Sequence, residues 1–450
     1  MSAVADIDIR ATIDGLRFGR YQVLVVALCM LATIFDGYDT QSIGYVAPLM
    51  AKDLGLAMAS FGPIFAAGLV GLMLGAMAFG TLADNIGRRW SVMLSVLVYG
   101  VFSLLTPLAD SFASLLALRF LAGLGCGGTL PNVIALTREY TPERSSAFAT
   151  NVISACFALG SILGGVFSAS VTGAYGWQAI FYIGGVAPLF VLLAVALWLP
   201  ESISFLALKG TASAEIVRIL GKITRQAVPT DTRFKLPEWN EPGLTVQHLF
   251  REGRAAMTIL LWVAFFMNLL VLLLLVQWLP SLLREAGLPL QTAIATTVGF
   301  NVGGVLSAPL LGRLMDRFNP YVILAGTFVC TAFFIAIAGN SISSQAVLMA
   351  AVFFSGAGVN GGQASLNTLA GLLYHTAIRS TGVGWALGVG RIGAIVGPLI
   401  GGLLVSMQWH SSSIILVAVV PMLVGGAVVW ALRQTRGAGE AMKLAPRRFQ

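Results

Sequence analysis

The sequence predicts an all-α membrane protein with twelve transmembrane helices in two six-helix halves. Its 450 residues are 57% hydrophobic and 10% charged, whereas a soluble domain has roughly 25% charged residues. Apolar runs of about 20 residues, enough to cross about 30 Å of hydrocarbon, recur along the chain. They lack the alternation of lipid-facing barrel strands, so we expect helices. The expected spans are residues 21–49, 58–82, 90–108, 112–136, 147–172, 178–199, 255–283, 291–314, 321–339, 345–373, 380–404 and 412–432.

Basic residues are divided unevenly between the two sides of these spans. With the N-terminus placed inside, Lys52 and Arg284 fall outside, and Arg119 and Arg391 lie within spans; the rest of the 27 Lys and Arg residues fall inside. This is the positive-inside pattern, which predicts an integral plasma (inner) membrane protein with both termini in the cytoplasm. Orientation in the lipid bilayer therefore explains the net charge of +8, and we expect no nucleic acid partner.

The same pattern predicts the organisation of the chain. A charged, proline-containing segment separates two groups of six spans and is expected to be a cytoplasmic linker. The expected parts are a cytoplasmic N-terminal lead (1–20), an N-terminal six-helix half (21–199), the linker (200–254), a C-terminal six-helix half (255–432) and a cytoplasmic tail (433–450).

Two aspartates lie inside the first span, in the stretch Asp36-Gly37-Tyr38-Asp39. Because they are three residues apart, they share one face of a helix. A carboxylate at membrane depth costs about 2.5–3.5 kcal/mol even on the lenient insertion scale. We therefore expect Asp36 and Asp39 to face water, a partner charge or a ligand along a polar pathway. A static buried ion-pair network is the alternative.

A glycine-rich basic loop joins the second and third spans. It comprises residues 80–89 and reads G-T-L-A-D-N-I-G-R-R. Gly80 and Gly87 are expected to allow close packing and a sharp turn, and Asp84 to cap or pair near a helix end. Residues 312–317 repeat G-x-L-x-D at the corresponding place in the second half and then depart, with Asn319-Pro320 in place of Gly87-Arg88. Such repeats are typical of two related halves.

Two arginines lie well inside spans. Arg119 lies roughly 12 Å along the fourth span, and Asp36 and Asp39 roughly 22–27 Å along the first from the opposite side. In a core about 30 Å thick these depths allow an ion pair, although a purely structural counter-ion remains an alternative. Arg391 lies on the eleventh span, and no Asp or Glu occurs in the last six spans. That absence favours a role toward an anionic ligand.

Three amides follow one another at near-helical spacing on the tenth span. Asn360, Gln363 and Asn367 are candidates to line a cavity, or to bond neighbouring helices to one another. The sequence leaves both possibilities open.

These motifs resemble those of known transporters. The twelve spans and the G-x-L-x-D-x-x-G-R-R loop resemble the major facilitator superfamily, and Pro200-Glu201-Ser202 is also familiar there. Asp36-Gly37-Tyr38-Asp39 with Thr40-Gln41-Ser42-Ile43-Gly44-Tyr45, and Leu130-Pro131-Asn132, resemble the aromatic acid:proton symporter family within it. The resemblance implies import of an aromatic carboxylate of hydroxybenzoate, protocatechuate or benzoate type by proton symport through alternating access. The alternatives are another organic anion (muconate or arylpropionate type) or a transporter-derived receptor.

The residue patterns and the resemblance together indicate roles for individual residues, and the resemblance itself points to Asp36, Asp39, Asp84, Arg119 and Arg391. Proton coupling is expected at Asp36 and Asp39, with substrate binding at Arg119, Arg391, Tyr38, Asn360, Gln363 and Asn367, and gating at Gly80, Asp84, Gly87, Arg88, Arg89, Asp316 and Arg317. The incomplete second copy of the loop puts a symmetrical gating role for Asp316 and Arg317 in doubt.

Other classes of function find no support in the sequence. No G-x-x-x-x-G-K-[ST] loop occurs, so transport would be secondary and not ATP-driven. No nucleophile–base pair or metal-ligand cluster is evident, so we expect no enzyme, no metal and no cofactor. The protein is expected to function as a monomer in the bilayer.

Overall fold

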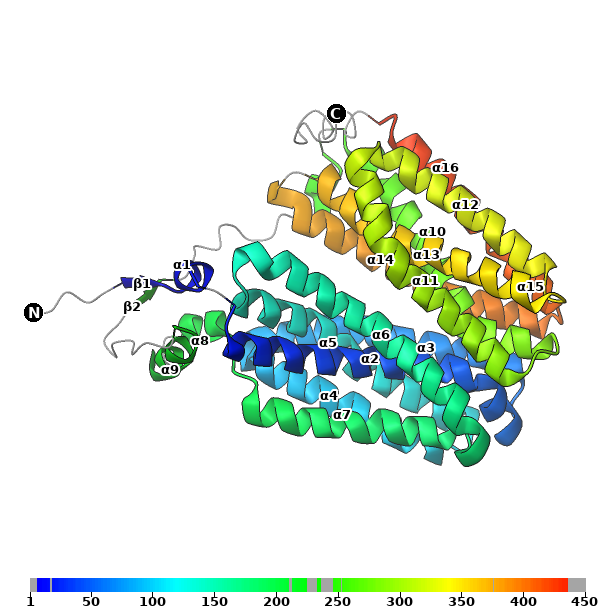
Figure 1. Cartoon of the computed structure of the whole chain (residues 1–450), viewed down its shortest axis with the longest axis horizontal. Coiled ribbons are helices and arrows are strands. Elements are labelled where there is room, and N and C mark those ends of the chain that lie inside the picture. The colour runs from blue at the N-terminus through cyan, green and yellow to red at the C-terminus, as the bar shows by residue number, and fades with distance from the viewer. Residues whose placement is uncertain are drawn as a thin grey trace, which may run out of the picture. The chain divides into compact units, whose positions relative to one another are not determined.

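The computed structural model describes residues 6–16, 18–209, 213–224, 233–235, 246–251, 253–374 and 376–435. These residues are almost wholly helical, and twelve helices are long and apolar enough to cross a membrane (Figure 1). The predicted all-α fold with twelve membrane-spanning helices is therefore confirmed. The remaining parts of the expected lead, linker and tail lie outside the described residues, and the proposed domain boundaries stay a prediction.

The first six spans are formed by α2 to α7. Glycine separates α3 from α4, since Gly87 has a φ of 104°, a backbone conformation that glycine adopts at little cost. Ser111 caps α5 and forms a capping box with Ser114. The elements are α2 (Arg20–Asp53), η1 (Met58–Ser60), α3 (Phe61–Ile86), α4 (Arg88–Leu105), η2 (Thr106–Leu108), α5 (Phe112–Tyr140), α6 (Glu143–Tyr175) and α7 (Gln178–Trp198).

The last six spans are formed by α10 to α16. The departure of the second loop copy at Asn319-Pro320 has a local cause: Asn319 caps α12 by accepting from the Tyr321 amide at 3.0 Å, and Pro320 occupies the first turn. The elements are α10 (Ala255–Glu285), α11 (Leu290–Arg317), α12 (Pro320–Asn340), α13 (Gln345–Leu373), α14 (Thr376–Ser406), α15 (Ser411–Val417) and α16 (Val419–Leu432).

Short elements of the lead and linker lie together at one end of α2 to α7 (Figure 1). The buried Ile9 and Ile13 of the lead share a hydrophobic cluster with Ile216 and Ile219 of the linker. The elements are β1 (Asp6–Asp8), α1 (Ile9–Asp14), α8 (Ile203–Lys209), α9 (Ser213–Thr224) and β2 (Arg233–Lys235), with β1 and β2 pairing in parallel. A further short turn of the linker, η3 (Val246–Leu249), precedes α10.

The chain forms two compact units. The first unit comprises Met1–Thr40, Val70–Leu163 and Gln178–Asn240, and the second comprises Gln41–Leu69, Gly164–Trp177 and Glu241–Gln450. Because these boundaries cut α2, α3 and α6, one end of each of these helices belongs to the second unit.

In the second unit these helix ends pack against α10 and α11. The Phe65 ring of α3 meets Trp278 of α10 edge-on, with ring centroids 5.5 Å apart. The Tyr45 hydroxyl of α2 accepts a hydrogen bond from Asn301 Nδ2 of α11 at 3.3 Å. The second unit is therefore held together by contacts between the beginning and the end of the chain.

Candidate functional site

A buried ion pair joins α2 and α5 in the first unit. Arg119 Nη1 of α5 lies 3.5 Å from Asp39 Oδ2 of α2, and each side chain is only 4% exposed. Ser103 Oγ of α4 donates to Asp39 Oδ1 at 2.6 Å, and Cys126 Sγ lies 3.8 Å from Oδ2. The structure thus brings Arg119 and an aspartate together, an arrangement that the helix depths allow.

The guanidinium of Arg119 is held from several directions. Its Nη2 donates to Thr106 Oγ1 and lies 3.5 Å from the Phe102 carbonyl oxygen. The Phe181 ring of α7 covers the guanidinium at 4.8 Å, a cation–π contact. One carboxylate, one hydroxyl and one aromatic ring therefore surround this buried charge.

The other members of the Asp-Gly-Tyr-Asp stretch face different neighbours. Asp36 is 2% exposed and, like Asp39, lies close to the Cys126 thiol. The buried Tyr38 donates its hydroxyl proton to the Ile180 carbonyl of α7 at 3.1 Å. Tyr38 thus packs within the first unit, and its expected contact with substrate stays a prediction.

Gly37 is the point where α2 meets α6. A Cβ at Gly37 would collide with the carbonyl oxygen of Phe157, and a Cβ at Gly160 would collide with that of Ile34. The two glycines allow the backbones to touch, as small residues do at membrane helix interfaces. This contact sets the rotation of α2 that directs Asp39 toward α4 and α5.

One of the three amides of α13 takes part in a hydrogen bond between α13 and α10. Asn268 Nδ2 of α10 donates to Gln363 Oε1 at 2.8 Å and to the Val359 carbonyl at 3.2 Å. Gln363 Nε2 in turn lies 3.4 Å from Oδ1 of the exposed Asn367. Asn360 is half-buried against α11, where a Cβ at Gly304 would meet its side chain. Gln363 therefore bonds two helices, while Asn367 is accessible.

Arg391 belongs to the second unit and is half-buried on α14. Its helix lies against α10, because a Cβ at Gly390 would come 2.6 Å from Leu269 Cδ1 and one at Gly393 would strike the Phe266 carbonyl. The two interior arginines therefore differ, since Arg119 is almost fully buried.

The basic loop is anchored by a carboxylate at the start of the linker. Arg89 N donates to Glu201 Oε1 at 3.0 Å, and the Ser202 amide donates to the same oxygen at 2.8 Å. A Cβ at Gly87 would collide with Glu201 Oε2, so only glycine leaves room for the carboxylate at the start of α4. Burial raises the pKa of Glu201 above its ordinary value, and the Arg89 and Ser202 amides oppose that rise.

A second link joins this loop to α5. Arg88 forms an ion pair with Glu139, whose other carboxylate oxygen accepts from Ser202 Oγ at 2.7 Å. Sequence reasoning assigned no such role to Glu139 or Glu201. The Pro200-Glu201-Ser202 stretch was the available signal, but it does not reveal which loop the carboxylate contacts.

The remaining loop residues show fewer contacts. Asp84, Asp316 and Arg317 are exposed, and none of them joins an ion pair within the described part of the chain. A Cβ at Gly80 would meet no atom within 4 Å, so the expectation of close packing there is wrong. The roles of these residues in gating stay predictions.

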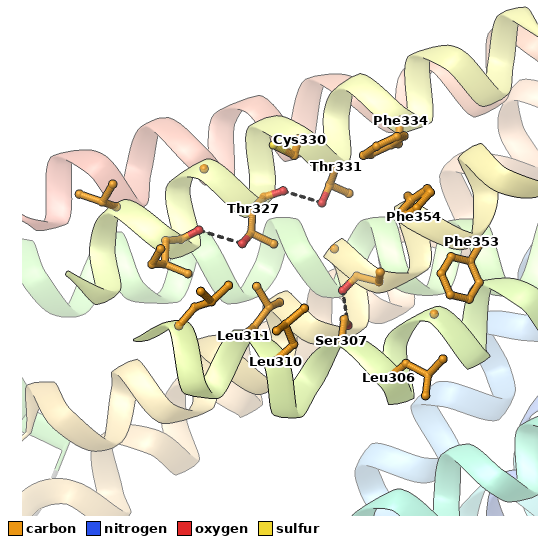
Figure 2. A pocket seen from close by; sticks show the side chains of 17 residues that line it. Leu306, Ser307, Leu310, Leu311, Thr327, Cys330, Thr331, Phe334, Phe353 and Phe354 are labelled. Atoms are coloured by element: carbon orange, nitrogen blue, oxygen red, sulfur yellow. Dashed lines mark hydrogen bonds between the residues drawn. The ribbon is translucent and has the colours of Figure 1, made fainter. Parts of the chain in front are cut away.

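A groove of about 500 Å³ lies between α11, α12 and α13 in the second unit (Figure 2). Its hydroxyls are already bonded: Ser307 donates to the Ala357 carbonyl at 2.6 Å, Thr327 to Ile323 at 2.8 Å and Thr331 to Thr327 at 2.7 Å. The residues lining it include no charged side chain, so this groove does not suit a carboxylate.

Solved transporters share this fold. The chain superposes on a bacterial homologue of the human lysosomal transporter Spinster with a TM-score of 0.73 at 15% identity, covering 94% of this chain and 98% of that one. The xylose transporter XylE from E. coli gives a TM-score of 0.73 at 15% identity, covering 93% and 99%. At this level of identity the likeness concerns the fold alone.

Curated relatives are transporters of aromatic acids. The chain is 37% identical to the 4-hydroxybenzoate transporter PcaK of Acinetobacter baylyi, over 93% of this chain and 92% of that protein. It is 32% identical to the benzoate transport protein of A. baylyi (96% and 94%) and 32% identical to the 3-(3-hydroxy-phenyl)propionate transporter of Escherichia coli K12 (92% and 94%). The chain is therefore an integral membrane transporter and not an enzyme, as the sequence predicts.

The family of the chain is shown by the residues that match a family model. Residues 29–300 and 289–447 match the Major Facilitator Superfamily. These matches include most of α2 with its aspartates, the basic loop and all of the last six spans. The chain belongs to the major facilitator superfamily.

Proposed function

We propose that the protein imports an aromatic carboxylate of hydroxybenzoate, protocatechuate or benzoate type together with protons, through alternating access. The observation that carries the proposal is the buried Asp39–Arg119 pair in a chain whose relatives transport aromatic acids. A carboxylate held at 4% exposure beside a cation is a costly feature, and in membrane proteins such residues mark ion and substrate pathways.

The proton step belongs to Asp39 and its neighbour Asp36. Protonation of Asp39 cancels one charge of the pair, so it weakens the attraction that joins α2 to α5. A carboxylate that loads a proton in one state and releases it in another couples the proton gradient to that rearrangement. An asparagine at this position keeps the shape of the aspartate side chain, but its amide cannot take up and release a proton as a carboxylate does.

The substrate carboxylate is assigned to Arg391. Arg119 already contacts Asp39, Thr106 and Phe181, whereas Arg391 is only half-buried and belongs to the other unit. The planar guanidinium fork can hold both oxygens of a carboxylate with charge assistance. Asn360, Gln363, Asn367 and Tyr38 complete the proposed set of substrate residues.

Alternating access is supported by the packing of the second unit. There the Phe65–Trp278 and Tyr45–Asn301 contacts join the ends of α3 and α2 to α10 and α11. In the proposed cycle these contacts break and re-form, and Asp84, Arg88, Arg89, Asp316 and Arg317 are assigned to gating at the cytoplasmic end. We place the protein in the inner membrane as a functional monomer with both termini in the cytoplasm.

The test is transport by the reconstituted full chain. Proteoliposomes with an acidic exterior should accumulate labelled 4-hydroxybenzoate above the external concentration, and a protonophore should abolish the accumulation. Asp39→Asn and Asp36→Asn should lose uphill accumulation, while Asp110→Asn, at an exposed aspartate between α4 and α5, should retain it. Uphill uptake by both amide variants would contradict the assignment.

Arylpropionates form a second candidate substrate class. The similarity to the 3-(3-hydroxy-phenyl)propionate transporter favours them. A ligand stabilises the state that it binds, so thermal unfolding of the purified protein with a panel of benzoates and arylpropionates separates the classes. Stabilisation by arylpropionates alone would replace the benzoate assignment.

A further inference from the structure

The helix α4 directs two hydroxyls toward the Asp39–Arg119 pair. Ser103 Oγ donates to Asp39 Oδ1 at 2.6 Å, and Thr106 Oγ1, in the η2 turn that extends α4, accepts from Arg119 Nη2. The two side chains are three residues apart, a spacing that places them on one face, and both are 0% exposed. One stretch of chain therefore contacts both members of the ion pair.

We propose that Ser103 and Thr106 are positioning residues for the proton step at Asp39. A hydroxyl that donates to a carboxylate stabilises the charged form relative to the acid. Thr106 holds the guanidinium where it stabilises the same charge. The proposal rests on the assignment of Asp39 as a proton carrier and adds the two hydroxyls that hold the carboxylate and the guanidinium in place.

Thr106 is oriented for this role by its own hydrogen bond. Its hydroxyl donates to the Phe102 carbonyl at 2.8 Å. The single hydroxyl proton is thereby used, and the lone pairs of the oxygen remain to accept from Arg119. A valine of the same shape would offer no acceptor.

Other serine hydroxyls of α4 donate to backbone carbonyl oxygens. Ser95 Oγ donates to the Ser91 carbonyl one turn earlier at 2.8 Å, and Ser91 Oγ donates to the Phe79 carbonyl at 2.8 Å. Such bonds to backbone carbonyls satisfy a hydroxyl in a membrane helix without further consequence. Ser103 differs because its proton goes to an ionisable group on another helix.

The helix α7 closes the site from the other side. A Cβ at Gly184 would lie 3.3 Å from Ser103 Oγ and 2.9 Å from Tyr38 Cε1, and Phe181, one turn earlier, covers Arg119. The glycine at position 184 therefore lets the backbone of α7 approach the Ser103 hydroxyl.

The pH dependence involves a small set of groups. The titratable or charged side chains that face Asp39 are Arg119 and Cys126 from α5, Tyr99 from α4 and Asp36 from α2 itself. Arginine keeps its charge at every assay pH. A change in the acidic part of the transport profile therefore reports on a carboxylate.

The experiment measures initial uptake of labelled 4-hydroxybenzoate by proteoliposomes as external pH is varied. Ser103→Ala removes the hydroxyl that donates to Asp39 Oδ1, so the midpoint of uptake should move up by about one pH unit. Thr106→Val should move it in the same direction, and Thr106→Ser should restore it. The control Ser95→Ala, at an equally buried hydroxyl on the same helix, should leave the midpoint unchanged.

Two further outcomes are decisive. The shifts of Ser103→Ala and Thr106→Val should not add in the double variant, because both act on one ion pair. If the pH midpoint of uptake is unchanged in Ser103→Ala while the wild-type protein still accumulates substrate, this inference alone is overturned. If the wild-type protein does not accumulate substrate, the proposed function is overturned. If Ser103→Ala does not fold, the Thr106→Val and Thr106→Ser pair decides, and equal midpoints for both overturn the inference.

Discussion

Asp39 and Arg119 form an ion pair of 3.5 Å between α2 and α5 although each side chain is only 4% exposed. Two buried charges in contact stabilise a fold only while both are present. The loss of one leaves the other desolvated and uncompensated, which costs about 3–5 kcal/mol.

The first prediction concerns the dependence of each buried charge on its partner. Arg119→Gln should lower the free energy of unfolding by about 3 kcal/mol or more, and the double variant Asp39→Asn/Arg119→Gln should recover most of it, because no buried charge remains. Thermal unfolding in detergent measures both. The double variant should still lack proton-driven accumulation; stability losses that simply add would show that the two side chains do not act as a pair.

The second prediction concerns the substrate carboxylate. Arg391→Lys keeps the charge but loses the planar fork, and Arg391→Gln loses both, so affinity for 4-hydroxybenzoate should fall in that order. Loss of a charge-assisted hydrogen bond is worth about 1.5–3 kcal/mol, or roughly 10- to 150-fold in dissociation constant. Calorimetric titration gives the values. Unchanged affinity in Arg391→Gln, with lost affinity in Arg119→Gln, would move the carboxylate site to α5.

The third prediction tests the contact between α2 and α6. A methyl group at Gly37 would collide with the Phe157 carbonyl, so Gly37→Ala should destabilise the protein by about 1–3 kcal/mol. Gly173→Ala on α6 is the matched control, since a Cβ there meets no atom within 4 Å. The control should be neutral or slightly stabilising because alanine favours a helix. Equal unfolding temperatures for the two variants would contradict the contact.

The fourth prediction concerns the glycine at the start of α4. Gly87 has φ 104° and ψ 155°, a conformation that is almost exclusive to glycine, and a Cβ there would also strike Glu201, whereas a Cβ at Gly55, with a φ of 63°, meets no atom. Gly55→Ala should therefore cost about 1 kcal/mol, and Gly87→Ala should cost more because backbone strain and collision add. Unfolding temperatures of the two variants provide the comparison, and a larger loss in Gly55→Ala would contradict the placement of Glu201.

The fifth prediction uses the pH dependence of stability. Because burial raises the pKa of Glu201 above its ordinary 4.5, the folded protein keeps this proton to higher pH than the unfolded chain does. The stability linked to that proton is present below pH 4.5 and is lost as pH rises through the folded pKa. The unfolding temperature of wild type minus that of Glu201→Gln should therefore fall as the pH rises above 4.5. A constant difference would contradict the effect of burial.

Much of the fold follows from local composition. A bilayer requires each span to be apolar and of a certain length, so hydropathy along the chain is enough to locate twelve helices. The cost of a carboxylate in hydrocarbon likewise marks Asp36 and Asp39 before any contact is known. Helix rise then shows that Arg119 lies at a depth compatible with them.

Other features depend on how the helices are rotated against one another. Hydropathy does not reveal that Asp39 is the aspartate that pairs with Arg119, or that Ser103 donates to it. Nor does spacing show that Gln363 bonds across to Asn268 or that Gly80 has open space beside it. These relationships arise from the close approach of particular backbones.

The sequence alone determined the membrane-spanning fold and the residues that are costly to bury, because both depend on the solvent around each segment. The tertiary structure decided which neighbours compensate those residues. Gly37 meets α6, and this contact sets the face that α2 turns toward α4 and α5. A side chain one position further along a helix points about 100° away, so partner choice is settled only when the helices pack.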